Sequence, residues 1–485
     1  MKKNIGYIAM TGALVFSLTL SSCKKYLDIN KSPNSAENVD AKLLFSTAST
    51  AHATLRSSGD FYIPLGLGGQ SFADGGNNPT AWDAPSPGEY VFSTNFFGNT
   101  WGGLYNTVGV NLVQAINIAE NTSPVNNNGA AQCKVLLAQA FYDLSITHGD
   151  VPFSEAFRAD VSYPKFDSQK EVLEGCVAKL DEALAQFDEA STIKFSDYDL
   201  FFKGDIAKWK RVAKSLKLRI LMTMVDKDPT KAAAIGQLIT TGGLVSSGGD
   251  NWKITFQDAS GRKNPKFGLS EQYNSGVNFF FGSKYVVDFM RDLSDPRLPK
   301  YFDKPAAADN YYGITPGEDG DDDHDARIST SLQTPTEPEI FFSYQEELFF
   351  EAEAYARGLG VAANLATANT LFKKAIEESC KFYGVAAGTA ASFAAGLPDL
   401  ATVANPVKLI HYHHWIDKME EPAEAFTEWR RSGVDGDETP ELTLPVGAPS
   451  TPLFRRYEYH LANELSLNPN APEQLKYYEK MWFDL

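Results

Sequence analysis

The sequence predicts a mostly α-helical protein, in which helical hairpins form a scaffold and long, aromatic-rich loops project from it. Several segments carry apolar residues at the three- and four-residue spacing of amphipathic helices. These segments come in pairs separated by residues that favour turns. Three further stretches have no helical or strand period, yet they contain too many aromatic residues to be disordered.

The composition is that of a large folded protein with a net negative charge. Of its 485 residues, 43% are hydrophobic and 12% are aromatic, which excludes disordered and fibrous classes. Asp and Glu exceed Lys and Arg by 61 to 44, and a charge of -17 argues against a nucleic-acid partner. The four cysteines are too few and too scattered for a disulfide framework or a zinc ribbon.

Residues 1–22 have the pattern of a lipoprotein signal peptide. A short basic start is followed by an apolar core over residues 5–20. Leu20-Ser21-Ser22-Cys23 then forms a lipobox, which predicts a diacylglyceryl group on Cys23. Stable anchoring needs more than one acyl chain, and this group supplies two. Residues 23–40 are then a lipidated tether and residues 41–485 the folded body. An ordinary secretory signal with an incidental cysteine is the alternative.

Amphipathic spacing predicts one single helix and three helical hairpins. The single helix covers Leu43–Leu55. The hairpins are Leu104–Ala119 with Cys133–Thr147, Glu171–Ala190 with Lys208–Val225, and Glu346–Arg357 with Ala366–Tyr383. Such recurrence is typical of a tetratricopeptide-like solenoid, although no segment matches the tetratricopeptide consensus.

The three irregular stretches are predicted to be ligand-facing loops, at about residues 60–100, 241–281 and 302–338. Structureless loops of this length are uncommon in compact domains and usually have a function. Aromatic rings can stack on the C–H faces of sugars, and amide or carboxylate groups can pair with the hydroxyls. The candidate ligand-binding residues are Trp82, Gln70, Asn77, Asn78, Tyr90, Trp252, Tyr273 and Tyr311. For each aromatic residue, packing of the loop onto the scaffold is the alternative.

Two clusters could hold a metal ion. Asp319, Asp321 and Asp323 alternate as the carboxylates of calcium loops do, but the glycine and glutamate expected at the sixth and twelfth positions are missing. A solvated acidic loop is the alternative to a structural calcium site. The histidines of Ile410-His411-Tyr412-His413-His414-Trp415 could bind a transition metal, but no Cys, Asp or Glu lies among them. An interior or surface histidine cluster without metal is favoured there.

Signatures of catalysis are missing from the sequence. It has no Gly-x-Ser-x-Gly elbow, no P-loop, no His-Glu-x-x-His and no Cys-x-x-Cys. A pair of carboxylates acting as a glycosidase is neither supported nor excluded, because their separation depends on the fold. The residues alone therefore give no positive case for catalysis, and no cofactor is expected.

Short motifs run in a fixed order behind the lipobox. They include Tyr26-Leu27-Asp28-Ile29-Asn30, Trp101-Gly102-Gly103-Leu104-Tyr105, His148-Gly149-Asp150-Val151-Pro152, Ala213-Lys214-Ser215-Leu216-Lys217-Leu218-Arg219 and Trp429-Arg430-Arg431-Ser432-Gly433. On these residues the chain resembles the SusD/RagB outer-membrane lipoproteins of Bacteroidota, specifically the SusD-like subgroup, along almost its whole length. It departs from the family at His413-His414-Trp415, where Gln-Lys-Trp is usual, and at Lys24 and Lys25, where acidic residues often follow the lipidated cysteine.

The resemblance implies a binding protein rather than an enzyme. Members of the family act as a lid on a SusC-like TonB-dependent transporter, and they capture oligosaccharides or, in some cases, peptides. It implies a lipid-anchored protein on the outer membrane that faces the cell exterior, with tetratricopeptide-like hairpins against the transporter. Trp209, Trp415, Trp429 and Arg430 would then be buried scaffold residues. A surface glycoside hydrolase and a structural lipoprotein of the transporter complex without ligand contact are the alternatives.

Overall fold

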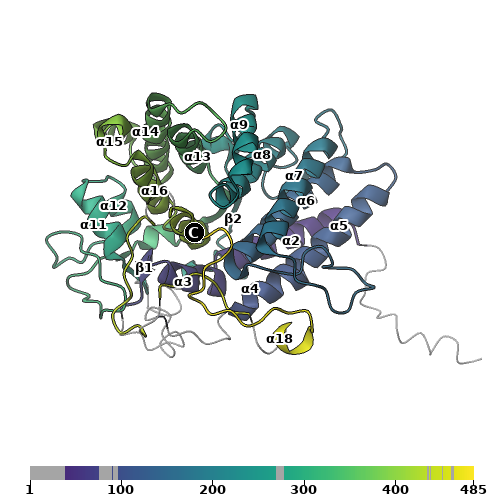
Figure 1. The fold of residues 1–485 in the computed structure, drawn as a ribbon, viewed down its shortest axis with the longest axis horizontal. Helices are drawn as coiled ribbons and strands as arrows, with labels where there is room; N and C mark the ends of the chain where they lie inside the picture. Colours follow the sequence, from purple (N-terminus) through teal and green to yellow (C-terminus); the bar gives the residue numbers. More distant parts are fainter. Residues whose placement is uncertain are drawn as a thin grey trace, which may run out of the picture. The chain divides into compact units, whose positions relative to one another are not determined.

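The computed structural model describes residues 39–75, 90, 97–268, 278–433, 436, 438–449, 452–459 and 464–485. The chain separates into two units, Met1–Asp40 and Ala41–Leu485, and every described helix and strand belongs to the second unit (Figure 1). This unit is mostly helical, as predicted. No helix in the described ranges is both long and apolar enough to cross a membrane.

Six helices form an N-terminal array in which each helix contacts the next (Figure 1). They are α2 (Ala41–Arg56), α5 (Val110–Asn121), α6 (Asn127–His148), α7 (Gln169–Gln186), α8 (Ile206–Met224) and α9 (Ala232–Thr241). The predicted pairs α5 with α6 and α7 with α8 are thus confirmed. Helix α6 is buried around almost its whole circumference, which fits its place between α5, α7 and α8.

Local sequence explains where the helices of this array begin and end. Ser168 accepts a hydrogen bond from the main-chain N–H of Glu171, whose carboxylate accepts from the N–H of Ser168, and this capping box starts α7. Helix α7 ends at Gln186, four residues earlier than predicted. Phe187 turns to an extended backbone and is buried, while the Asp188 N–H donates to the Asn128 side chain at 2.9 Å.

Five helices form the C-terminal part of the frame: α13 (Tyr344–Arg357), α14 (Leu365–Phe382), α15 (Ala387–Gly396), α16 (Pro406–Asp417) and α17 (Pro422–Arg431). Helices α13 and α14 are the third predicted hairpin. The left-handed Gly358 ends α13. Phe349, Phe372 and Ile410 belong to the apolar core that joins α13, α14 and α16.

The described ranges also contain shorter helices and turns. The helices are α3 (Gly59–Gly68), α4 (Gly98–Gly103), the π-helix η3 (Leu104–Gly109), α11 (Lys284–Asp292), α12 (Leu298–Tyr301) and α18 (Glu464–Leu467). The 3₁₀ turns are η4 (Ser196–Tyr198), η5 (Pro229–Lys231), η6 (Gly248–Asp250), η7 (Thr330–Leu332) and η8 (Leu400–Thr402). Helix α3 corrects the prediction of an irregular stretch from residue 60, because this helix is buried on all sides and so shows no amphipathic period.

Two small antiparallel sheets complete the unit. Strand β2 (Trp252–Thr255) pairs with β6 (Pro338–Phe342). The second sheet has the order β1-β3-β5-β4. Its strands are β1 (Phe72–Ala73), β3 (Phe281–Gly282), β5 (Arg327–Ile328) and β4 (Phe302–Asp303).

Buried ion pairs link elements that are far apart in the sequence. Arg56 of α2 donates to Asp143 of α6 at 2.9 Å and to Glu424 of α17 at 2.8 Å. Arg219 of α8 forms a two-pronged pair with Glu346 of α13, at 2.6 and 2.8 Å. All five side chains are buried, so the loss of one partner would leave a buried charge with less compensation.

Candidate functional site

The four-stranded sheet brings together the described ends of all three predicted loops. Strand β1 belongs to the loop at 60–100, β3 ends the loop at 241–281, and β4 and β5 lie in the loop at 302–338. Ala73 pairs with Phe281, which pairs with Arg327, which also pairs with Asp303. Two-residue strands give no readable sequence period, so this junction could not be predicted.

Residues 438–449 join the same surface, although they lie outside the three predicted loops. The Val446 N–H donates to the Pro316 carbonyl at 2.9 Å. The Gln70 side chain donates to the Thr443 carbonyl at 2.7 Å, and the Tyr285 hydroxyl lies 2.7 Å from the Thr443 hydroxyl. We call the surface formed by the described residues of the three loops, α11 and residues 438–449 the loop face.

The loop face carries apolar and aromatic side chains that solvent can reach. Leu444 and Val446 are 40% and 49% exposed. The ring of Tyr312 is stacked on His324 with 4.2 Å between centroids, and its hydroxyl donates to Asp309. A surface that mixes rings, carboxylates and hydroxyls can stack on sugars and bind their hydroxyl groups.

Three of the candidate ligand-binding residues are buried instead. Gln70, Tyr90 and Trp252 are 0%, 1% and 0% exposed, so in this conformation they offer no surface to a ligand. The Tyr90 hydroxyl donates to the Gly68 carbonyl, and burial raises its pKa. These contacts fit the packing alternative that the sequence left open.

Trp252 also corrects the prediction that residues 241–281 are irregular throughout. It begins strand β2, which pairs with β6 about 85 residues later in the chain. Its ring packs on Phe341 with 4.9 Å between centroids. A pairing over that distance leaves no local signal, so a short apolar strand resembles a loop with aromatic residues.

Tyr311 lies on the loop face and is half-buried. Its carbonyl accepts a hydrogen bond from Arg291 of α11 at 3.3 Å, and partial burial raises the pKa of its hydroxyl. The other candidates are outside the described residues, so their assignments stay predictions. They are Trp82, Asn77, Asn78, Tyr273 and the lipidation site Cys23.

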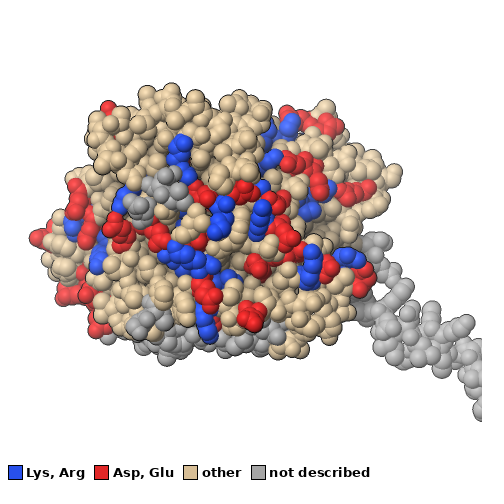
Figure 2. Space-filling model, in the orientation of Figure 1, with Lys and Arg blue, Asp and Glu red and all other residues tan. Residues whose placement is uncertain are grey.

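Residues 318–325, which we call the acidic run of the loop at 302–338, are exposed except at positions 320 and 325. Figure 2 shows acidic side chains along the left edge, on the side where Figure 1 places α11 and α12. The Asp321 carboxylate accepts from the Asp323 N–H at 2.9 Å. In the described part of the chain, Asp319, Asp321 and Asp323 do not form a group whose ligand atoms lie within 4.8 Å of one another. The calcium site stays a prediction.

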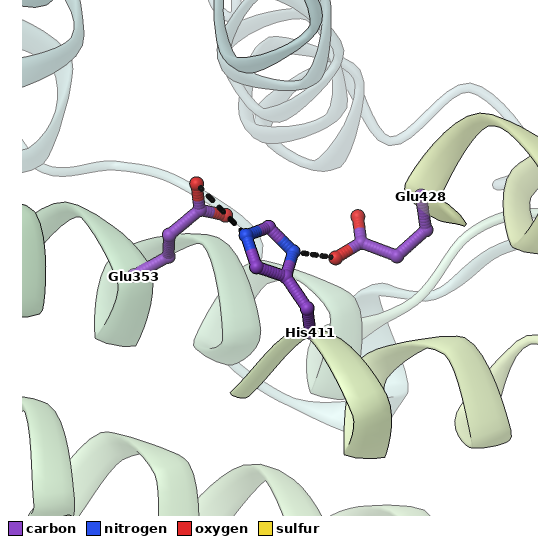
Figure 3. Close-up of side chains that lie close together, drawn as sticks. All are labelled: Glu353, His411 and Glu428. Carbon is purple, nitrogen blue, oxygen red and sulfur yellow. Dashed lines mark hydrogen bonds and ion pairs between the residues drawn. The ribbon is translucent and has the colours of Figure 1, made fainter. Parts of the chain in front are cut away.

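One cluster does bring three metal-ligating side chains together, and the sequence did not reveal it. Glu353 of α13, His411 of α16 and Glu428 of α17 are buried, and their ligand atoms lie within 4.8 Å (Figure 3). The His411 ring lies between the two carboxylates, with Nδ1 2.6 Å from Glu428 and Nε2 3.8 Å from Glu353. The two acids are distant from the histidines in sequence, which is why no metal pattern is visible there.

The chemistry of this cluster fits an ion-pair network better than a metal site. Arg431 donates to Glu353 at 2.5 Å and to Glu428 at 2.7 Å. Arg357 donates to Glu353 as well, at 2.7 Å. These guanidinium groups, together with the imidazole, already compensate the carboxylates and occupy the oxygen atoms that a metal would need.

The other two histidines are also interior residues. His413 contacts the rings of Phe289 and Phe372, and burial lowers its pKa to about 3, so the ring is neutral at ordinary pH. His414 stacks on Phe349 with 4.9 Å between centroids. The histidine run thus lies in the interior, which is one of the two placements that the sequence left open.

The motif residues expected to be scaffold are buried, as predicted. Trp209, Trp415, Trp429 and Arg430 are at most 1% exposed. The Arg430 guanidinium donates to the Ile146 carbonyl at 2.8 Å, and burial lowers its pKa to about 9. These buried residues belong to the helical frame.

The comparisons with known proteins agree with this architecture. The profile of the SusD-like family described as "Starch-binding associating with outer membrane" matches residues 78–459. A solved chitin-binding protein is similar with a TM-score of 0.76 at 22% identity, covering 92% of this chain and 100% of its own. A comparison with curated proteins found no match.

Two further solved structures show the same fold. A chitin-binding SusD homologue from Flavobacterium johnsoniae has a TM-score of 0.72 at 20% identity, over 92% of this chain and 98% of its own. A SusD homologue from Parabacteroides distasonis has a TM-score of 0.77 at 18% identity, over 92% and 98%. Together with the family match over most of its length, these findings place the chain in the SusD/RagB family, in its SusD-like group of carbohydrate-binding, outer-membrane-associated proteins.

Proposed function

We propose that this protein captures oligosaccharides on its loop face and delivers them, as a lid, to a TonB-dependent transporter in the outer membrane. The observation that carries the proposal is the four-stranded sheet, which joins the described ends of all three predicted ligand-facing loops. Membership of the SusD/RagB family supports the same role. Capture and delivery need no bond cleavage, so the protein is proposed not to be an enzyme.

The side chains of the loop face suit a sugar ligand. Tyr311 and Tyr312 can supply stacking faces, and Asp309 and the exposed acidic run can accept hydrogen bonds from sugar hydroxyls. A structural calcium ion at Asp319, Asp321 and Asp323 remains part of the proposal. Peptides are the second nutrient class to be tested.

The membrane anchor is proposed to be the diacylglyceryl group on Cys23, with residues 23–40 as its tether. The protein is proposed to face the cell exterior. Lys24 and Lys25 stand where acidic residues often direct surface export in this family. Surface labelling of intact cells decides the orientation, because a periplasmic protein would stay unlabelled until the outer membrane is opened.

The transporter is proposed to dock on the N-terminal array, at α2 and η3. A groove of about 570 Å³ lies there, lined by Ser46, Thr47, Thr50, Ala51, Thr54, Leu55, Gly103 and Thr107. Neither residues 43–55 nor residues 98–119 contain an Asp, Glu, Lys or Arg. A protein partner can therefore cover this face without removing charged groups from water.

Isothermal titration of the purified protein against neutral, acidic and amino-bearing oligosaccharides and short peptides tests the proposal. We expect binding to at least one oligosaccharide, and Tyr311→Ala should weaken it. Tyr198→Ala is the matched control, because solvent reaches Tyr198 as it reaches Tyr311, but Tyr198 lies beside α2 in the helical array. The same titration with calcium and with a chelator tests the calcium site.

Two further results would contradict the proposal. One is release of reducing ends from the bound oligosaccharide, which would make the protein a glycoside hydrolase. The other is isolation of the lipidated protein from native membranes with neither a β-barrel partner nor affinity for any nutrient.

A further inference from the structure

Arg327 connects two of the loops at the loop face. It lies in β5, within the loop at 302–338, and its side chain is 17% exposed. One guanidinium nitrogen, Nη1, donates to the carbonyls of Asn278 at 2.8 Å and Phe279 at 3.1 Å, at the end of the loop at 241–281. The other, Nη2, pairs with Asp322 in the acidic run.

Phe281 contacts this guanidinium and brings in the third loop. The Cζ atom of Arg327 is 3.7 Å from the centroid of the Phe281 ring, which is 2% exposed. The backbones of Gly75, from the loop at 60–100, and Gly320, from the acidic run, pack on the same ring. A Cβ atom would lie 2.3 Å from the ring at Gly75 and 2.5 Å from it at Gly320. The Gly320 N–H also donates to the Gly75 carbonyl at 2.8 Å.

We propose that Arg327, Phe281, Gly75 and Gly320 form a positioning hub, which fixes the three loops relative to one another and thereby sets the affinity of the loop face for its oligosaccharide. The proposal rests on the proposed function, because it assumes a ligand at this face. The hub residues act through the loops that they hold and not by direct contact with the sugar.

The chemistry of each hub residue suits this role. The arginine side chain is planar and always charged, so it can lie on an aromatic ring while it donates to two carbonyls and a carboxylate. A lysine keeps the charge but not the planar set of donors. The glycines are needed because any side chain at these positions would collide with Phe281, and Gly75 also has a φ of +74°.

A hub of this kind strengthens binding because it orders the loops before the ligand arrives. A surface whose loops are fixed beforehand loses less conformational freedom when the ligand arrives. If the hub is broken, the loop residues become ordered only when the ligand binds, and the free energy of ordering them lowers the affinity. Ordering even one or two residues corresponds to a loss of affinity of about ten-fold or more.

The test compares Arg327→Met, Arg327→Lys and Gly320→Ala with the wild type, using the oligosaccharide that binds best. We expect each variant to raise Kd by about ten-fold or more while keeping the wild-type circular dichroism spectrum and thermal midpoint of the helical frame. Gly388→Ala in α15 is the matched control, because no described atom lies within 4 Å of the added Cβ there. It should bind as the wild type does.

Hydrogen exchange gives a readout that does not need a ligand. The Gly320 amide, which donates to Gly75, should exchange faster in Arg327→Met than in the wild type, while amides of α13 and α14 should not change. If the wild type binds no oligosaccharide, the proposed function fails, and hydrogen exchange still tests the hub. Unchanged affinity in folded Arg327→Met, or full rescue by Arg327→Lys, would overturn the hub.

Discussion

Replacing Arg219 by Met tests the role of the buried ion pairs that hold the frame. Arg219 joins α8 to α13 through its two-pronged pair with Glu346, and both side chains are at most 2% exposed. The Met side chain fills similar space but cannot compensate the carboxylate. We expect the variant to fold with its free energy of unfolding reduced by about 3 kcal/mol.

The magnitude follows from the ionisation of Glu346. Burial alone would raise its pKa, but the charges of Arg219 and then Lys418 hold the pKa at about 2, below the ordinary 4.5. The lowered pKa of Glu346 corresponds to about 3 kcal/mol of stability, at 1.36 kcal/mol per pH unit, and Arg219 contributes more to it than Lys418 does. In other proteins the loss of one partner of a buried pair lowers the free energy of unfolding by about 3–5 kcal/mol, and the value expected for Arg219→Met lies at the lower end of this range.

Thermal unfolding followed by circular dichroism measures the effect. The entropy of unfolding is about 2.1 cal/mol/K per residue, so a unit of this size loses about 1 °C in Tm per kcal/mol, and we expect a decrease of about 3 °C. Arg158→Met is the control, because the Arg158–Asp160 pair is exposed, and its Tm should not change. The double variant Arg219→Met/Glu346→Leu should recover part of the loss, since the undercompensated carboxylate is removed while Lys418 keeps Glu421 at 3.1 Å.

The stabilisation by the Arg219–Glu346 pair should decrease as the pH falls. Because the pKa of Glu346 is lowered in the folded state, its contribution is complete above about pH 4.5 and is lost as the pH falls towards 2. The decrease in Tm of Arg219→Met relative to the wild type should therefore be largest near neutral pH and shrink in acid. A Tm within 1 °C of the wild type at pH 7 would refute this account of the frame.

Three other predictions concern the body and the anchor. Burial raises the pKa of Glu351 to about 7, so the folded state keeps a proton that the unfolded chain loses, and stability should fall by up to about 3 kcal/mol as the pH rises from 4.5 to 7. Glu351→Gln should remove this slope in denaturant titrations at several pH values. Gly236→Ala should destabilise by about 1–3 kcal/mol, because its Cβ would lie 2.0 Å from the Gly360 carbonyl oxygen, whereas Gly388→Ala should not. Cys23→Ala should release the protein from membranes, and mass spectrometry should find acyl chains only on the wild type.

The helical frame could be predicted from sequence because its signals are local. Most of the predicted helices have an apolar stripe on one side, and the start of α7 and the end of α13 follow from Ser168 and Gly358. Helix α3 was not predicted, for the opposite reason. It is buried on all sides, so its apolar residues show no period that distinguishes a helix from a loop with Gly and Pro.

The loop face could be predicted only in part. The composition of the three loops pointed to ligand contacts, but not to which aromatic residues stay exposed. Trp252 is core because it pairs with a strand about 85 residues away, whereas Tyr311 remains at the surface. The Glu353–His411–Glu428 cluster could not be recognised in the sequence either, since its members come from three helices. Contacts of this range depend on the finished fold.

The frame and the loop face are held by different kinds of interaction, and this has a consequence for function. The frame depends on buried side-chain pairs such as Arg219 with Glu346, where almost any replacement of one partner is costly. The loops meet at two-residue strands, at glycine backbones and at main-chain carbonyls that accept from Arg327. Contacts made by the main chain do not depend on which side chains the loops carry on their outer side. The outward residues of the loops can therefore change, and with them the preference of the proposed sugar site, while the hub and the frame keep their geometry.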